Sequence, residues 1–169
     1  MNLTTRALVG QLLTVGFNGT RPTQTLAKAL NQEERGGVIL FKRNLTDDIF
    51  DTAALNHELA QCSASRVPLL VAVDQEGGRV ARIKTPALVL PPMLVLGERA
   101  SHDLLRDTAR AQARELAALG FTMNFAPILD VNSRPENPII GDRAFSSDAE
   151  TAAARALTYA EGMGEGGIF

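Results

Sequence analysis

Short apolar runs alternate with amphipathic stretches along the whole chain. Residues 37–41 (Gly-Val-Ile-Leu-Phe) and 68–73 (Pro-Leu-Leu-Val-Ala-Val) are almost entirely apolar, which is typical of strands buried on both faces. Weaker runs of the same kind occupy residues 14–17 and 121–125. The pattern therefore predicts a strand at each of these positions, with helices between them.

The stretches between the expected strands have helical spacing and recognisable end signals. Helices are expected before residue 14, from residue 22 to about 31, from 46 to about 64, from 101 to 120, and from 147 to about 162. Gly120 is well placed to end the fourth helix, whose apolar positions include Leu104, Leu105, Ala109 and Leu116. The residues that we expect to cap or open the helices are Thr4 or Thr5, Pro22, Thr46, Ser101 and Ser147.

Strands that alternate with helices imply parallel pairing with right-handed crossovers. An open doubly wound sheet and part of a closed (β/α)8 barrel both satisfy this pattern. Two long polar loops, residues 74–92 and 127–145, leave the carboxyl ends of strands, where such barrels build their ligand sites. We therefore expect an α/β fold of the (β/α)8 TIM-barrel type, truncated to about the first four β/α units, with residues 1–169 forming a single domain.

The first long loop begins Asp74-Gln-Glu-Gly-Gly-Arg-Val-Ala-Arg82. Asp74 offers a carboxylate at the tip of a buried strand, and Arg82 offers planar donors nearby, a combination that suits sugar hydroxyls. A structural Asp–Arg pair that fixes the loop explains the same residues equally well. Glu76 and Arg79 are three residues apart and could pair with each other locally, which favours a structural role for both.

The second long loop contains Asn132 and Arg143, and three prolines at positions 127, 135 and 138 stiffen it. A rigid loop can hold Arg143 over the ligand face, although an ion pair with Asp142 or Asp148 is an open alternative. For Asp130 and Asn132, hydrogen bonds within the loop are the favoured interpretation.

Composition and charge exclude several other functions. Seventeen Lys and Arg residues against 19 Asp and Glu residues give a net charge of −2, which offers no electrostatic reason for a nucleic-acid or anionic-membrane partner. Neither G-x-G-x-x-G nor G-x-x-x-x-G-K-[ST] occurs, so no nucleotide cofactor is expected. We find no signal peptide and no apolar run of membrane-spanning length, and a cytoplasmic location is the default expectation.

The few cysteine and histidine residues do not form a metal site in the sequence. Cys62 is the single cysteine, which excludes an internal disulfide, and we expect a small buried side chain. His57 and His102 fall in or at the start of helices, away from the ends of strands. We therefore expect them to be solvated or capping residues, and we expect no bound metal.

Three motifs resemble glycoside hydrolase family 3, and most closely its bacterial β-N-acetylhexosaminidase branch. They are Val73-Asp-Gln-Glu-Gly-Gly-Arg-Val-Ala-Arg82, Asn124-Phe-Ala-Pro-Ile-Leu-Asp-Val131 and Ile140-Gly-Asp-Arg-Ala-Phe-Ser146, and residues 36–41 also match that branch's second strand. The resemblance implies an enzyme that removes terminal N-acetylglucosamine from peptidoglycan fragments in the cytoplasm. It further implies a retaining mechanism with a covalent glycosyl–enzyme intermediate and no cofactor.

The same resemblance assigns substrate-binding roles to Asp74, Arg82 and Arg143, and none of these residues breaks the bond. The branch continues into a fifth strand with a K-H-F-P-G-H-G motif, an acid/base loop and a later nucleophilic aspartate, none of which this sequence contains. Neither His57 nor His102 matches those positions. We therefore expect no catalytic residue in residues 1–169 and no glycosidase activity in the isolated chain.

Two alternatives remain at this point. One is a non-catalytic half-barrel that binds sugar or acts as an assembly module, with self-association through its open edges. The other is a protein that binds a different polar metabolite through Asp74 and Arg82, which requires the family motifs to be coincidental.

Overall fold

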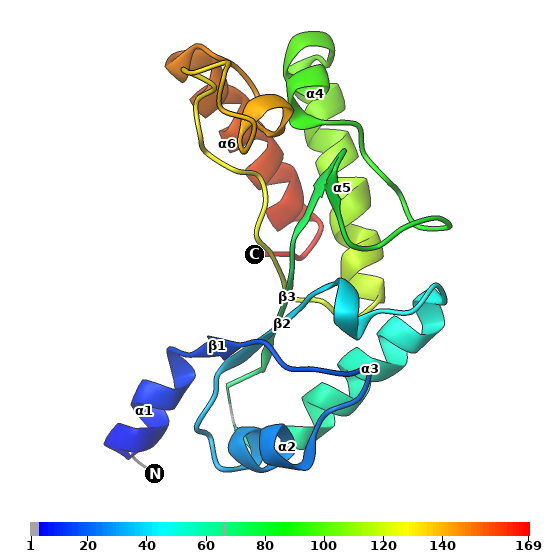
Figure 1. Cartoon of the computed structure of the whole chain (residues 1–169), viewed down its shortest axis with the longest axis vertical. Helices are drawn as coiled ribbons and strands as arrows, with labels where there is room; N and C mark the ends of the chain where they lie inside the picture. The colour runs from blue at the N-terminus through cyan, green and yellow to red at the C-terminus, as the bar shows by residue number, and fades with distance from the viewer. Residues whose placement is uncertain (1–3, 66) are drawn as a thin grey trace. The chain divides into compact units, whose positions relative to one another are not determined.

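The computed structural model describes residues 4–65 and 67–169, and a parallel β-sheet organises them (Figure 1). The sheet has the order β1-β2-β3-β6, in which β1 is Thr14–Val15, β2 is Gly37–Leu40, β3 is Leu70–Val73 and β6 is Met123–Asn124. β2 pairs in parallel with both β1 and β3, with Leu40 opposite Val73. The expected α/β fold with parallel pairing is confirmed, whereas the closure of such units into a (β/α)8 barrel stays a prediction.

The strands are shorter than the apolar runs that predicted them, because side chains replace part of the backbone pairing. Phe41 leaves β2 and donates its backbone N–H to the side-chain oxygen of Asn44, at 3.0 Å. Beside β3, the hydroxyl of Thr122 accepts a hydrogen bond from the backbone N–H of Val71 at 2.8 Å. A side-chain acceptor satisfies these backbone groups as well as a further strand residue would.

Helices follow the strands in the expected order. Their bounds are Thr5–Gln11 (α1), Gln24–Asn31 (α2), Ile49–Cys62 (α3), Met93–Arg99 (α4), His102–Ala118 (α5) and Ala149–Glu165 (α6). Two short 3-10 turns, Lys42–Asn44 and Gly141–Arg143, complete the helical elements in the described part of the chain.

Two of the expected caps are confirmed. The hydroxyl of Thr4 accepts from the backbone N–H of Ala7, and the hydroxyl of Ser101 accepts from that of Leu104. Beyond α5, Gly120 has a φ of +86°, a conformation that favours glycine at a helix end. Among the apolar positions of α5, Leu105, Ala109 and Leu116 are buried, whereas Leu104 is exposed.

The other three caps were assigned one or two residues too early. Thr23 caps α2 in place of Pro22, Asp48 caps α3 in place of Thr46, and Asp148 caps α6 in place of Ser147. For α3 the physical reason is visible: the hydroxyl of Thr46 binds the carboxylate of Asp51, leaving the Asp48 carboxylate to accept from the backbone N–H of Phe50.

The first long loop contains regular structure that the sequence pattern did not predict. Gln75–Gly77 (β4) and Val80–Ala81 (β5) form an antiparallel hairpin, and α4 follows at residues 93–99. In α4, Met93 is buried and Gly97 lies against the backbone of Phe145, where a Cβ atom would come within 2.2 Å of the carbonyl oxygen. This close packing fixes α4 against the backbone at Phe145, the end of the second long loop.

The chain packs into two compact units. The first comprises residues 4–65, 67–73 and 118–123, and its core includes Leu30, Val38, Leu40 and Leu59. The second comprises residues 74–117 and 124–169, and its core includes Leu105, Ala109, Phe145 and Tyr159. The single domain expected over residues 1–169 stays a prediction.

Candidate functional site

The hairpin β4–β5 carries most of the candidate site, and it begins directly after β3. Gly77 and Gly78 make its turn, with φ values of +125° and +53°. A Cβ atom on Gly77 would lie 2.6 Å from the carbonyl oxygen of Pro91, so both the backbone conformation and the available space require glycine there. The turn keeps residues 74–76 close to residues 79–82.

The buried side chain of Gln75 fixes the far end of the hairpin. Its carbonyl oxygen accepts from the backbone N–H groups of Arg82 and Ile83, at 2.7 and 2.9 Å, and its amide nitrogen donates to the carbonyl of Ile83 at 2.9 Å. Asn124 of β6 binds the backbone of Gln75 in turn, accepting at 2.9 Å and donating at 3.0 Å. The backbone that presents Arg82 is therefore held by fully paired amide groups.

Asp74 and Arg82 form a single-point ion pair at the base of the hairpin. The distance from Arg82 Nη2 to Asp74 Oδ2 is 3.2 Å, and the side chains are 27% and 22% exposed. Arg82 Nε is buried without a hydrogen-bond partner among the described residues. Because both side chains are partly exposed and share a single contact, each keeps accessible surface that a bound molecule can reach.

Glu76 and Arg143 form a two-point ion pair. Arg143 donates from Nε and from Nη2 to the two carboxylate oxygens of Glu76, at 2.8 and 2.7 Å. The expected pair of Glu76 with Arg79 is wrong, as is the alternative of Arg143 with Asp142 or Asp148. Both expectations were based on short sequence separation, whereas the actual partners are 67 residues apart.

The pKa of Arg143 is raised, chiefly by its hydrogen bonds to Glu76, while partial burial acts in the opposite direction. The negative charges of Glu76, Asp130 and Asp74 add to this rise. The carboxylates of Asp74 and Asp130 therefore lie within electrostatic reach of the Arg143 guanidinium group.

Arg79 stabilises the loop that carries Arg143. Its guanidinium group donates to the backbone carbonyl oxygens of Pro138, Ile139 and Ile140, at 2.8, 2.7 and 3.0 Å, and lies 3.4 Å from the Asp142 carboxylate. One planar side chain thus satisfies successive carbonyl groups in an irregular segment.

All of the residues expected to bind substrate therefore lie around one hairpin of the second compact unit. Asp74 and Arg82 are in direct contact, and Arg143 is attached to the hairpin through Glu76. Asp130 is exposed, and the backbone N–H of Asn132 donates to the carbonyl of Ser146. That these residues bind a sugar stays a prediction.

Sequence reasoning placed too little weight on Gln75, Glu76 and Arg79. A local signal for Gln75 and Glu76 does exist, because polar residues directly after a buried strand require partners once they are themselves buried. No comparable signal identifies those partners.

The histidine and cysteine residues lie apart from these contacts. His57 is exposed on α3 and its ring nitrogen lies 2.8 Å from the Gln61 amide, while the ring of His102 lies 2.7 Å from the hydroxyl of Thr158. Cys62 is partly exposed, where a buried side chain was expected. In residues 4–65 and 67–169 no cluster of His, Cys, Asp and Glu side chains could hold a metal ion. Over the same ranges no helix combines the length and apolarity needed to cross a bilayer.

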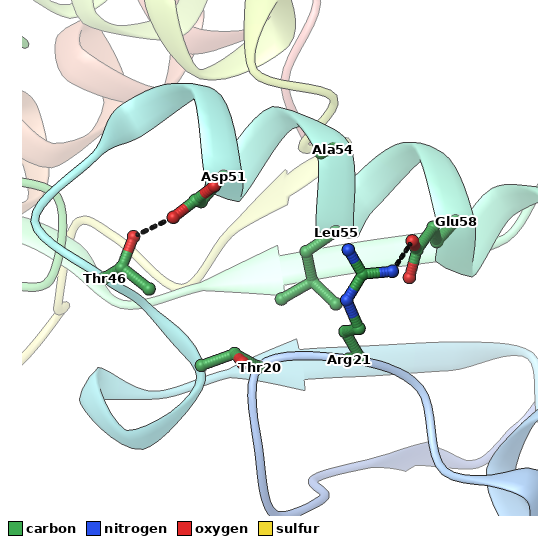
Figure 2. A pocket seen from close by; sticks show the side chains of 7 residues that line it. All are labelled: Thr20, Arg21, Thr46, Asp51, Ala54, Leu55 and Glu58. Carbon is green, nitrogen blue, oxygen red and sulfur yellow. Dashed lines mark hydrogen bonds and ion pairs between the residues drawn. The ribbon is translucent and has the colours of Figure 1, made fainter.

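The first compact unit contains a hollow of about 260 Å³ beside α3 (Figure 2). Its polar side chains bind one another: Arg21 pairs with Glu58 at 2.6 Å, and the hydroxyl of Thr46 donates to Asp51 at 2.8 Å. These mutual contacts satisfy the polar groups at the edge of the hollow, and none of the motifs singled out in the sequence reaches it. The hairpin is therefore the better candidate for a functional site.

Comparison with known proteins shows which family the chain belongs to. Residues 4–169 match the family model described as "Glycosyl hydrolase family 3 N terminal domain". The chain belongs to glycosyl hydrolase family 3. The match includes every residue of the hairpin and of the loop that carries Arg143, so the resemblance seen in the three sequence motifs is confirmed.

Several similar members of family 3 are named for hexosaminidase activity. Beta-hexosaminidase LpqI of Mycobacterium tuberculosis is 37% identical over 169 residues, covering 98% of this chain and 41% of LpqI. The structure of a family 3 β-N-acetylglucosaminidase from Paenibacillus sp. str. FPU-7 superimposes with a TM-score of 0.92 at 38% identity, covering 99% of this chain and 32% of that protein.

A third similar structure contains an amino sugar. It is NagZ from Neisseria gonorrhoeae in complex with N-trifluoroacetyl-D-glucosamine, with a TM-score of 0.83 at 31% identity over 92% of this chain and 47% of NagZ. The chain thus spans less than half the length of each of these relatives.

Proposed function

We propose that this chain is the substrate-binding, amino-terminal part of a retaining β-N-acetylhexosaminidase that removes terminal N-acetylglucosamine. One observation carries the proposal: the Asp74–Arg82 and Glu76–Arg143 pairs meet at a single hairpin whose backbone is fixed by Gln75. A carboxylate and two guanidinium groups then converge on one place. The names of the relatives and the amino sugar bound to NagZ support the same substrate class.

The chemistry of these groups suits a sugar. A carboxylate such as that of Asp74 can accept hydrogen bonds from neighbouring hydroxyl groups, and guanidinium groups can donate to hydroxyl or N-acetyl oxygens. The Asp74 and Arg82 side chains are about one quarter exposed, so an approaching hydroxyl group can reach both.

Bond cleavage is proposed to need groups from outside residues 1–169. Retaining hydrolysis requires a nucleophilic carboxylate and an acid/base group about 5–5.5 Å apart on either side of the scissile bond. Asp74 and Glu76 are each already bound to an arginine, so neither is placed as a free proton donor. We therefore assign these carboxylates to binding and expect no hydrolysis by the isolated chain.

The natural substrate we propose is a peptidoglycan fragment with a terminal N-acetylglucosamine, handled in the cytoplasm during recycling of the cell wall. This narrower assignment rests on the resemblance of the three motifs to the bacterial branch of the family.

Self-association is the second candidate, and one observation favours it. Leu8 and Val9 of α1, and Leu12 directly after it, are each more than half exposed, which leaves apolar surface for a second copy of the chain. Sedimentation of the isolated chain as a monomer at high concentration would exclude it.

Titration of the chain with N-acetylglucosamine, followed by amide NMR, tests the sugar assignment. We expect shifts centred on residues 74–82 and 141–143, and a loss of affinity in Arg82→Ala and Arg143→Ala. The matched control is Arg106→Ala, which removes an arginine paired with Glu161 on the surface of α5 and α6 and should bind the sugar normally. Equal losses in all three variants would contradict the assignment.

Activity is tested separately with a chromogenic β-N-acetylglucosaminide. We expect the isolated chain to release no chromophore. Release that Asp74→Ala abolishes would show that Asp74 takes part in cleavage and would refute the purely binding role.

A further inference from the structure

The Glu76 carboxylate is the least exposed acidic group in any ion pair of the described chain. Its side chain is 4% exposed, against 22% for Asp74, which comes next. A carboxylate this deeply buried is retained only when its partner and hydrogen bonds compensate for lost hydration. Arg143 provides both through its two-point contact.

The contact determines which edge of the Arg143 guanidinium group faces outward. Its Nε and Nη2 atoms each donate to Glu76, and its Nη1 atom donates to the carbonyl oxygen of Ile139 at 3.2 Å. A guanidinium group has five N–H donors in a fixed plane, so two N–H groups stay free of partners among the described residues. Because three contacts define the plane, those two N–H groups point in a fixed direction.

The surroundings of Glu76 strengthen its hold on Arg143. Burial raises the pKa of the Tyr159 phenol, and the negative charge of Glu76 raises it further. The ring of Tyr159 packs at 6.1 Å from that of Phe145, two residues after Arg143. Charges beside such apolar rings interact more strongly than they do in water.

We propose that Glu76 is the positioning residue for Arg143 and, by neutralising it, restricts the site to uncharged amino sugars. This inference rests on the proposed sugar-binding function. Each arginine expected to bind substrate has its own carboxylate partner, Asp74 for Arg82 and Glu76 for Arg143. With the exposed carboxylate of Asp130 also near Arg143, these two arginines present no net positive charge to a sugar carboxylate or phosphate.

A pair of sugars that differ in charge tests this specificity. One is N-acetylglucosamine, and the other is 2-acetamido-2-deoxy-D-glucuronic acid, in which a carboxylate replaces the hydroxymethyl group at similar size. Their dissociation constants are measured for the wild type, Glu76→Gln, Arg143→Ala and the double variant. Glu161→Gln, at the exposed pair with Arg106, is the control for loss of one negative charge.

We expect Glu76→Gln to weaken binding of the neutral sugar about tenfold and to improve relative binding of the charged sugar, while Glu161→Gln changes neither. In the Arg143→Ala background, Glu76→Gln should have no further effect on either sugar. An unchanged ratio of the two affinities in a folded Glu76→Gln variant overturns the specificity role. If Glu76→Gln lowers the sugar affinity equally in the wild type and in Arg143→Ala, the positioning role is overturned, because a purely structural effect does not depend on the Arg143 side chain.

A measurement without sugar keeps the inference testable if Glu76→Gln does not fold. The side-chain Nε–H resonance of Arg143, assigned by its loss in Arg143→Lys, should exchange slowly with water in the wild type. Rapid exchange overturns the fixed orientation. If the wild type shows slow exchange but binds neither sugar, the proposed function fails and the specificity claim fails with it. If the protein binds sugar and Glu76→Gln leaves that binding unchanged, this inference alone is overturned.

Discussion

Two carboxylate–arginine pairs at the same hairpin differ in the number of their contacts and in the burial of the carboxylate, while their arginines are similarly exposed. Asp74 and Arg82 share one contact of 3.2 Å and are both about one quarter exposed. Glu76 and Arg143 share two contacts, at 2.7 and 2.8 Å, and the carboxylate is almost fully buried. The two carboxylates, Asp74 and Glu76, lie close together in the sequence, whereas Arg82 and Arg143 lie far apart. Both pairs nevertheless meet at β4–β5.

The difference indicates a division of labour. A single, partly solvated contact costs little to break, so under the proposed function Asp74 and Arg82 exchange each other for sugar hydroxyl groups. A buried two-point contact is costly to break, so Glu76 and Arg143 behave as a fixed frame. A binding site benefits from both, because the frame limits the entropy lost when the exchangeable groups engage a ligand.

Removal of the buried Glu76 carboxylate should have the largest effect on the free energy of unfolding. In Glu76→Ala the Arg143 guanidinium group loses its partner, and we expect the free energy of unfolding to fall by about 3 kcal/mol. Urea denaturation measures this loss, with Glu161→Ala as the exposed control. A loss as small as that of the control would mean that the two kinds of pair do not differ in energy.

Removal of the amide that holds the hairpin should come next. Gln75→Ala leaves the backbone N–H groups of Arg82 and Ile83 without their acceptor, and we expect a loss of about 2 kcal/mol in unfolding free energy. Hydrogen exchange should speed up at those two amides first. Acceleration spread evenly over the second unit would instead indicate that Gln75 has no local role.

Neutralising the exposed carboxylate should separate binding from stability. For Asp74→Asn we expect a change of less than about 1 kcal/mol in unfolding free energy, together with about a tenfold loss of affinity for N-acetylglucosamine. Calorimetric titration and thermal unfolding of the same sample give both values. A large loss of stability with normal affinity would reverse the roles assigned to the two pairs.

A fully exposed carboxylate gives the smallest expected effect. Asp148 accepts a hydrogen bond from the backbone N–H of Thr151 at the start of α6, and this bond lowers the pKa of its carboxyl group. Because the pKa is lower in the folded state, the stabilisation is present above the unfolded-state pKa of about 3.9 and is lost as the pH falls through the folded-state value.

Asp148→Asn should therefore remove the loss of stability that protonation of the Asp148 carboxyl group causes at acidic pH, while the asparagine still caps α6. Amide exchange at Thr151, followed as the solution is acidified, provides the measurement. The same acid dependence in wild type and variant would exclude Asp148 as its source.

The sequence was sufficient for features that depend on neighbouring residues. β2 and β3 were found because strands buried on both faces require unbroken apolar runs, and Thr4 and Ser101 were found because a cap acts within one helical turn. The remaining caps failed where two acceptors compete, as Thr46 and Asp48 do before α3. α4 was missed because it follows Pro92 without a side-chain cap, so the sequence offers no capping signal for its start.

The ion pairs of the site show the limit of local reasoning most clearly. Asp74 and Arg82 were both identified because each follows or flanks the buried strand. Helical spacing favours Arg79 as the partner of Glu76. The chain instead forms a hairpin there, and Glu76 pairs with Arg143, 67 residues away. The stiff loop allowed Arg143 to face the ligand side but left an ion pair equally open, and the family resemblance then gave Arg143 a substrate-binding role.

Tyr159 gives the protein a built-in optical reporter. It is the single tyrosine in a chain without tryptophan, and its hydroxyl donates to the buried carbonyl oxygen of Gln112. Burial raises its pKa, so the phenol of the folded protein should keep its proton above the ordinary tyrosine pKa of about 10. Above that pH only the unfolded chain ionises, so the stability of the folded protein should fall as the pH rises further. Ultraviolet absorbance of tyrosinate in alkaline solution should therefore appear together with unfolding, and its appearance in the folded protein would show that the core beside Glu76 admits hydroxide.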